Sequence, residues 1–476
     1  MLTYAVEDRG SLPLYEYLYR CIRQDILRGV LTANQRLPSK RQLADHLRLS
    51  VITVENAYAQ LEAEGYLYTL PRRGFFVSRV EQAPAASSPA PVPTPPEART
   101  WRLDLTRNQV DGSKFPVSTW ARLTRQVLSE GDAFFAPMPH QGLLLLRQAI
   151  AQDLRDFKGM AVSPEQIVVG AGAEYLYLLL AQLLGAQAVF ALEDPGYPKI
   201  RQVYAKCGAV CRPVPMDRQG ISLSALNASG ATAAHISPAH HYPTGIVTPI
   251  ARRQALLRWA EERNGIIIED DYDSEFRFAG RPLPTLQSID TGGRVIYMNT
   301  FSQTISRSMR IGFMVLPPHL LEQYRRELDF YACTVPALEQ HVLSRFLSGG
   351  YFEQHLSRMR KEYRARRGAV LDAFRTSPFA RRVTISEQGS GLHFLLRLST
   401  TLSDEDLRRR AEGHGVRLGF LSSYAALPHP EYAHTLVVNY AALDPSQLAQ
   451  AMALLADVFA ETESTPPPDS ASFSAK

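Results

Sequence analysis

Residues 294–317 read RVIYMNTFSQTISRSMRIGFMVLP, and this stretch decides the fold of the larger part of the chain. The apolar residues 295–297 are typical of a buried strand, and the hydroxyl residues Thr300 and Ser302 follow it directly, with Arg310 further along. Hydroxyl groups donate hydrogen bonds, and an arginine forks around phosphate oxygens. The pattern therefore predicts an anion site after a buried strand, with a plain core strand and loop as the alternative.

The chain from about residue 102 to residue 460 alternates helical patterns with short apolar strands, which predicts an α/β layer fold with a mostly parallel sheet. Ligands of such sheets bind at the carboxyl ends of the strands. Four further motifs follow apolar runs at that position: GAGAE at 170–174, EDPGY at 193–197, SPAHHYPTG at 237–245 and EDDYDSEF at 269–276. The first is a glycine turn before a helix, which offers free N–H groups to a phosphate.

Two of these motifs permit other chemistry. Residues 269–275 hold five acidic side chains, and hard cations prefer several oxygen ligands, so a metal site is one reading. The adjacent His240 and His241 suit acid–base chemistry or a metal, and we expect both to line a pocket as hydrogen-bonding groups.

The first eighty residues predict three helices and a hairpin. Pro13 can open a helix that Gly29 ends. Ser39 and Gln42 have capping-box spacing for a second helix, and Ser50 is a typical N-cap for a third. Two short apolar segments around a Pro-Arg-Arg turn follow. This order predicts a winged helix-turn-helix domain over residues 12–79, which carry ten Lys/Arg against six Asp/Glu.

Composition separates this region from the rest. Residues 80–101 are rich in Pro, Ala and Ser, which predicts an extended linker, and residues 462–476 predict a disordered tail. The 476 residues are 45% hydrophobic and 21% charged, as in soluble multidomain proteins. No apolar run reaches membrane-spanning length, and no signal-peptide pattern begins the chain. With four cysteines, the sequence predicts a cytoplasmic protein without membrane contact.

The string LPSKRQLADHLRLSVITVENAYAQLEAEGYL, residues 37–67, closely resembles the GntR-type DNA-binding domain. The resemblance implies that the third helix enters the major groove of a double-stranded operator and that the hairpin lies over the backbone or minor groove. It places these residues at the DNA: Lys40, Arg41, Ser50, Ile52, Thr53, Arg72 and Arg73. The sequence departs from the pattern at Val51, where relatives carry Arg or Lys.

The motifs of residues 102–461 resemble the fold-type I, aspartate-aminotransferase-like domain of the MocR family of GntR-type regulators, whose cofactor is pyridoxal 5′-phosphate. By this resemblance Tyr197 stacks on the pyridine ring, Asp270 faces its nitrogen, and Tyr272 donates to its 3-oxygen. The resemblance also implies that Arg310, Thr300 and Ser302 bind the phosphate. The resemblance also argues against a metal and implies a homodimer with the site at the subunit interface.

The sequence departs from this family at the residue that binds the cofactor covalently. The family segment reads T-F-S-K, whereas residues 300–303 read T-F-S-Q. An amide nitrogen cannot form the Schiff base, so the resemblance implies no catalytic residue and, at Gln303, a non-covalent contact at best. No lysine lies between Cys207 and Arg360, Ala173 replaces a threonine, and Val437 stands where many aminotransferases carry a substrate-binding arginine.

We therefore expect a DNA-binding transcriptional regulator whose aminotransferase-like domain dimerises and senses a small ligand, a B6 vitamer or an amino acid. A working pyridoxal-phosphate-dependent aminotransferase with an attached DNA-binding head is the alternative. Transamination needs the lysine both as imine partner and as proton carrier, which disfavours the enzyme.

Overall fold

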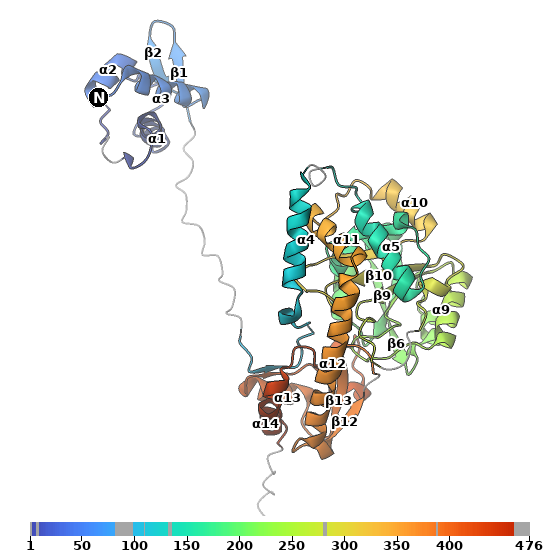
Figure 1. Cartoon of the computed structure of the whole chain (residues 1–476). Helices are drawn as coiled ribbons and strands as arrows, with labels where there is room; N and C mark the ends of the chain where they lie inside the picture. The colour runs from blue at the N-terminus through green and yellow to red at the C-terminus, as the bar shows by residue number, and fades with distance from the viewer. Residues whose placement is uncertain are drawn as a thin grey trace, which may run out of the picture. The chain divides into compact units, whose positions relative to one another are not determined.

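The structure is a computed structural model and describes residues 2–5, 9–80, 99–108, 110–131, 136–278, 283–386 and 389–460. The chain divides into two compact units, Met1–Ala98 and Arg99–Lys476 (Figure 1). Most of the expected linker and all of the expected tail lie outside the described residues. Among the helices that the structure describes, none is long and apolar enough to span a bilayer.

The N-terminal unit is the expected winged helix-turn-helix. It consists of α1 (Leu14–Leu27), α2 (Lys40–Leu47), α3 (Val51–Ala63) and the antiparallel pair β1 (Leu67–Leu70) and β2 (Gly74–Val77). The Ser39 side chain accepts from the N–H of Gln42, whose side chain accepts from the N–H of Ser39, so the predicted capping box is confirmed. The predicted N-cap is confirmed as well, because Ser50 accepts from the N–H of Thr53.

The larger unit is built on an eight-stranded sheet. Its strands are β4 (Ile167–Gly170), β5 (Val189–Asp194), β6 (Val210–Asp217), β7 (Gly220–Ile221), β8 (Ala233–Ile236), β9 (Ile266–Asp271), β10 (Val295–Thr300) and β11 (Gly312–Val315). The spatial order is β4-β11-β10-β9-β8-β5-β6-β7. The five strands from β10 to β6 run parallel, while β11 and β7 run antiparallel to their neighbours. The expected mostly parallel sheet is confirmed.

Helices cover both faces of this sheet. They are α4 (Val117–Ser129), α5 (Leu144–Lys158), α6 (Ala173–Leu184), α7 (Pro198–Lys206), α8 (Leu223–Ala228), α9 (Ile250–Glu262), α10 (Pro318–Glu327), α11 (Ala337–Ser348) and α12 (Tyr351–Thr376). Side chains alternate across β10, since Ile296 packs in the cluster beneath α6 and α10 while Tyr297 packs in the cluster beneath α5 and α11. Both faces are therefore apolar, and polar side chains are left for the strand ends.

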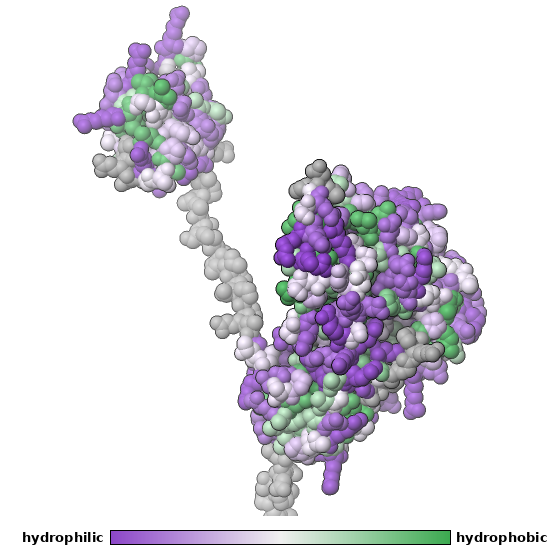
Figure 2. All heavy atoms as spheres, viewed as in Figure 1, coloured by the Kyte–Doolittle hydropathy of each residue, from purple (hydrophilic) through white to green (hydrophobic). Residues whose placement is uncertain are grey.

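A second, smaller layer follows α12, which runs from the large sheet to this layer (Figure 1). It contains the antiparallel strands β12 (Val383–Ser386), β13 (His393–Leu398) and β15 (Thr435–Asn439), with α13 (Asp404–Gly413) and α14 (Leu448–Phe459). The short strands β3 (Leu103–Asp104) and β14 (Val416–Arg417) pair beside it. Polar side chains predominate on the visible face of each unit, with separate hydrophobic patches between them (Figure 2).

Candidate ligand pocket and DNA-binding surface

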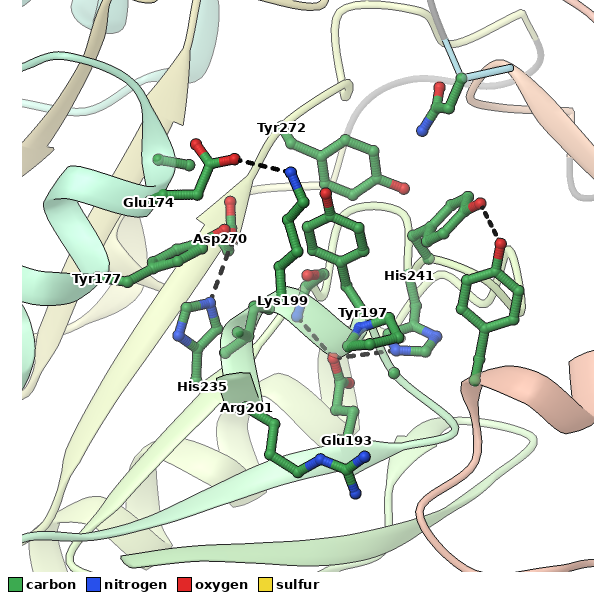
Figure 3. Close-up of a pocket in the computed structure, with 18 of the residues that line it drawn as sticks. Glu174, Tyr177, Glu193, Tyr197, Lys199, Arg201, His235, His241, Asp270 and Tyr272 are labelled. Atoms are coloured by element: carbon green, nitrogen blue, oxygen red, sulfur yellow. Dashed lines mark hydrogen bonds and ion pairs between the residues drawn. The ribbon is translucent and has the colours of Figure 1, made fainter. Parts of the chain in front are cut away.

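A cavity of about 700 Å³ opens at the carboxyl ends of β5, β8, β9 and β10. Parallel strands present these ends at one edge of the sheet, which brings together motifs that are far apart in the sequence. The structure places all seven residues expected at the cofactor on its wall: Tyr197, Asp270, Tyr272, Thr300, Ser302, Gln303 and Arg310. Tyr177, Glu193, His235 and His241 join them (Figure 3).

Asp270 is the best anchored of the polar groups. Its Oδ2 accepts from the Tyr177 hydroxyl over 2.6 Å and lies 3.2 Å from Nε2 of His235, whose Nδ1 lies 2.8 Å from the Tyr204 hydroxyl. Burial, followed by the nearby Asp270 charge, raises the pKa of Tyr177 well above its ordinary value, so this tyrosine stays a donor. Both contacts fall on Oδ2, and together they fix the orientation of the carboxylate.

The two adjacent histidines have different surroundings. His241 lines the cavity as expected, with Nδ1 2.7 Å from the Thr244 hydroxyl. His240 is a hydrogen-bonding group as expected but is not among the residues that line the cavity: its Nδ1 lies 3.0 Å from both oxygens of Asp273 and 3.3 Å from the Tyr272 hydroxyl. A Cβ at Gly391 would come within 1.7 Å of the His240 ring, so this imidazole fills the space between the EDDYDSEF loop and the C-terminal layer.

Glu193 and His241 form an uncharged pair at the cavity wall. Oε2 of Glu193 accepts from the N–H of Ser237 over 2.9 Å and lies 3.4 Å from Nε2 of His241. Burial raises the pKa of Glu193 to about 8, and burial together with the neighbouring His240 lowers the pKa of His241 to about 3. At neutral pH the pair therefore adds hydrogen-bonding groups to the cavity without adding charge.

The segment after β10 contributes hydroxyls, an amide and a cation. The Thr300 hydroxyl donates to Oγ of Ser302 over 2.9 Å. Oε1 of Gln303 is buried and has no hydrogen-bond partner among the described residues. Arg310 adopts a left-handed backbone with φ of 51°, and its guanidinium lies 2.5 Å from the carboxylate of Glu174 at the start of α6.

Lys199 is one of the pocket residues that sequence reasoning missed, together with Tyr177 and His235. It is the second residue of α7, and its Nζ lies 3.1 Å from Oε1 of Glu174 (Figure 3). It precedes the lysine-free stretch between Cys207 and Arg360, and its position two residues after Tyr197 was an available signal. Further exposed cations on the wall are Arg107, Arg201, Arg307 and Arg417.

The acidic string does not converge on one point. Asp271 binds Lys158 over 2.9 Å and accepts from the Tyr297 hydroxyl, while Glu269 accepts from backbone N–H groups of Leu286 and Gln287. Alternation along β9 sends neighbouring carboxylates to opposite faces of the sheet. Within the described ranges no group of three or more Cys, His, Asp or Glu side chains is arranged to hold a metal ion.

The residues expected at DNA occupy one end of α2, the start of α3 and the hairpin turn. Arg41, Arg72 and Arg73 are exposed, and Ile52 is 68% exposed at the first turn of α3. Lys40 differs, since its Nζ pairs with Glu55 over 2.6 Å.

The hydroxyls expected at DNA are close together. Oγ of Ser50 lies 2.7 Å from Oγ1 of Thr53, so these two groups share a hydrogen bond. The surface therefore combines exposed arginines with an apolar side chain at the helix start.

The sequence matches two families. Residues 14–77 match the family described as bacterial regulatory proteins, gntR family. Residues 102–455 match the family described as aminotransferase class I and II. A probable rhizopine catabolism regulatory protein, MocR of Rhizobium meliloti, is 34% identical, with 97% of each chain covered. This chain belongs to the MocR-type transcriptional regulators.

Other relatives of this MocR-type chain are also regulators. YdeL of Bacillus subtilis (strain 168), an uncharacterized HTH-type transcriptional regulator, is 35% identical over 92% of this chain and 95% of that protein. The pyridoxine biosynthesis transcriptional regulator PdxR of Corynebacterium glutamicum is 33% identical over 83% of this chain and 86% of that protein. The expected GntR-type head and aminotransferase-like body are thus confirmed.

Solved structures share the fold of the larger unit. Kynurenine aminotransferase of Pyrococcus horikoshii matches with a TM-score of 0.68 and 23% identity over 76% of this MocR-type chain and 91% of that chain. LysN, an α-aminoadipate aminotransferase from Thermus thermophilus, matches with a TM-score of 0.65 and 26% identity, covering 75% and 92%. Its crystals contain N-(5′-phosphopyridoxyl)-L-leucine. The aminotransferase class I fold family depends on pyridoxal phosphate.

Proposed function

We propose that this regulator binds a phosphorylated B6 vitamer non-covalently in its aminotransferase-like unit and that this ligand, or an amino acid bound with it, controls operator binding. One observation carries the proposal: seven side chains that suit such a ligand share one cavity, and one of them is Gln303, which stands where the family resemblance expects the Schiff-base lysine. The ligand is then a signal rather than a reagent.

The residues present fit pyridoxal phosphate. Asp270 would bind the pyridine nitrogen through Oδ1, because Tyr177 and His235 contact Oδ2, and Tyr272 would donate to the 3-oxygen. The close approach of Arg310 to Gly172, where a Cβ would lie 3.1 Å from Nη2, forms a cradle beside the N–H groups of α6. A glycine is needed there for close approach, and free N–H groups at a helix start favour a phosphate.

Gln303 changes the chemistry available to the ligand. Bound pyridoxal phosphate supplies an aldehyde and an electron-withdrawing ring. The Gln303 amide can donate to or accept from such a ligand, and its buried Oε1, without a partner among the described residues, is ready to accept. An amide neither attacks an aldehyde nor carries a proton between substrate atoms at neutral pH, so this residue orients the ligand without performing transamination.

On the DNA side, we propose that α3 enters the major groove and that the β1–β2 turn contacts phosphates. The exposed Arg41, Arg72 and Arg73 would neutralise backbone charge, and Ile52 would touch a thymine methyl. The exposed Val51 carries no charge, so the helix start relies on apolar contact.

We also propose a homodimer formed through the larger unit. Large apolar side chains are exposed on α4 and at the start of α5: Val117, Leu128, Leu144 and Leu145, between 43% and 66% exposed. Both helices pack against α11, and exposed apolar side chains can mark an interaction site. A dimer would present two DNA-binding units to a two-fold operator.

The test titrates purified full-length protein with pyridoxal phosphate and with pyridoxamine phosphate, each with and without amino acids, and follows absorbance and operator binding together. We expect saturable binding of both vitamers and a change in operator affinity. Absence of vitamer binding at millimolar concentration would overturn the proposal. Sedimentation showing only monomer at micromolar concentration would remove the dimer.

A further inference from the structure

The anion-binding end of the cavity contains a carboxylate of the protein itself. Glu174 is the second residue of α6, and its two oxygens bind different cations, with Oε2 2.5 Å from Nη2 of Arg310 and Oε1 3.1 Å from Nζ of Lys199. Figure 3 shows Lys199 reaching across the cavity toward Glu174, while Arg201 of the same helix points away. One carboxylate thus bridges two cations that come from different strand ends.

Glu174 also satisfies the helix start. Its carboxylate accepts from its own backbone N–H, one of the groups that a phosphate at this helix would use. Partial burial alone would raise the pKa of Glu174, but hydrogen bonds from Arg310, this N–H and Lys199 outweigh it and lower the pKa to about 2. Glu174 is therefore ionised at neutral pH and mimics a bound anion.

We propose that Glu174 holds the place of a phosphate monoester, which on binding takes over Arg310 and Lys199 from it. This inference rests on the proposed function, because it assumes that the cavity receives a phosphorylated ligand. Lys199 then supplies the second cation of the phosphate site and compensates for Ala173, which offers no hydroxyl.

The exchange is feasible because the existing ion pairs are partly solvated. The side chains of Glu174, Arg310 and Lys199 are 31%, 47% and 48% exposed, and exposed ion pairs of this kind contribute little stability. A phosphate dianion brings twice the charge of the carboxylate and three oxygens, which match the fork of an arginine. The three side chains sum to a charge of +1. Removing the Glu174 charge raises this sum to +2 and strengthens the attraction for a phosphate, whereas removing the Lys199 charge lowers the sum to zero and weakens it.

The experiment compares the wild-type protein with Glu174→Gln, Lys199→Met and the control Lys206→Met, an exposed lysine on the same helix α7. The probes are pyridoxamine 5′-phosphate, which has no aldehyde to react with lysine, and pyridoxamine, which has no phosphate. Binding is followed by ligand fluorescence, and thermal denaturation checks that each variant folds.

We expect Glu174→Gln to tighten pyridoxamine phosphate binding by about threefold or more, and Lys199→Met to weaken it by roughly tenfold. Neither substitution should alter the affinity for pyridoxamine, and Lys206→Met should alter the affinity for neither ligand.

An unchanged or weaker affinity of Glu174→Gln for the phosphorylated ligand would overturn the inference. So would a Lys199→Met variant whose affinities for the two ligands change by the same factor. Wild-type protein that binds both probes equally would also overturn it while leaving the proposed function standing. Wild-type protein that binds neither would reject the proposed function itself.

Discussion

Nε2 of His235 lies 3.2 Å from Oδ2 of Asp270, and the Tyr177 hydroxyl donates to the same oxygen. Three elements, β8, α6 and β9, therefore fix one carboxylate at the floor of the cavity. A carboxylate held by neighbouring donors keeps its orientation without a ligand, so a pyridine nitrogen can bind it with little reorganisation.

Asp270→Asn should weaken pyridoxamine phosphate binding by about tenfold or more, because it removes a charge-assisted hydrogen bond worth about 1.5–3 kcal/mol. Fluorescence titration measures the effect. The control is Asp217→Asn, which removes a carboxylate on β6 that pairs with Arg252 and should leave the affinity for pyridoxamine phosphate unchanged. Equal affinities of wild type and Asp270→Asn would show that Asp270 does not face the ligand.

Arg41→Ala should weaken operator binding and lower the salt slope of log K by about one unit, because one phosphate contact is lost. Lys40→Ala should have the smaller effect, since Glu55 already neutralises the lysine over 2.6 Å. Anisotropy titrations across a range of salt concentrations measure both. Unchanged affinity of Arg41→Ala at every salt concentration would contradict the proposed docking of α2.

Ile52→Ala should reduce discrimination between operator and random DNA by roughly 1 kcal/mol while leaving the salt slope unchanged, because its loss removes an apolar base contact rather than a charge. Its side chain is 68% exposed, so stability should not change. Competition with non-operator DNA measures the ratio of the affinities for operator and random DNA. A parallel loss of affinity for both DNAs would instead indicate a general defect in α3.

Glu193 predicts a pH dependence of stability. Its pKa rises from 4.5 to about 8 on folding because it is buried, so between these values the folded state binds one proton more than the unfolded state. Its contribution to the free energy of unfolding therefore falls as pH rises, by up to about 1.4 kcal/mol per pH unit. Glu193→Gln should flatten the fall in thermal midpoint between pH 5.5 and 7.5. Identical pH profiles of variant and wild type would show that Glu193 ionises in the folded state.

The sequence predicted the features that depend on local pattern. Ser39 and Ser50 cap their helices because cap chemistry is local, and Asp270 and Tyr272 reach the cavity because they end an apolar strand. The resemblance of short motifs then placed Tyr197 and Arg310 on the same wall.

Features that depend on strand order were not predictable in this way. His235 meets Asp270 only because β8 and β9 are neighbours, and Lys199 meets Glu174 only because α6 and α7 start at the same edge of the sheet. His240 was expected to line the pocket because it adjoins His241, whereas in the structure it binds Asp273 and packs against Gly391. Such pairings join residues that are far apart in the chain, and local periodicity carries no information on them.

A ligand held beside Gln303 without a covalent bond is central to the proposed function. In the most direct test, the protein is incubated with an equimolar amount of pyridoxal phosphate and the sample is divided in two. One portion is analysed by native mass spectrometry, and the other is reduced with borohydride, denatured and then analysed. We predict one ligand per chain in the native spectrum and an unmodified chain after reduction and denaturation. A reduced adduct on a single lysine, Lys199 included, would contradict the account.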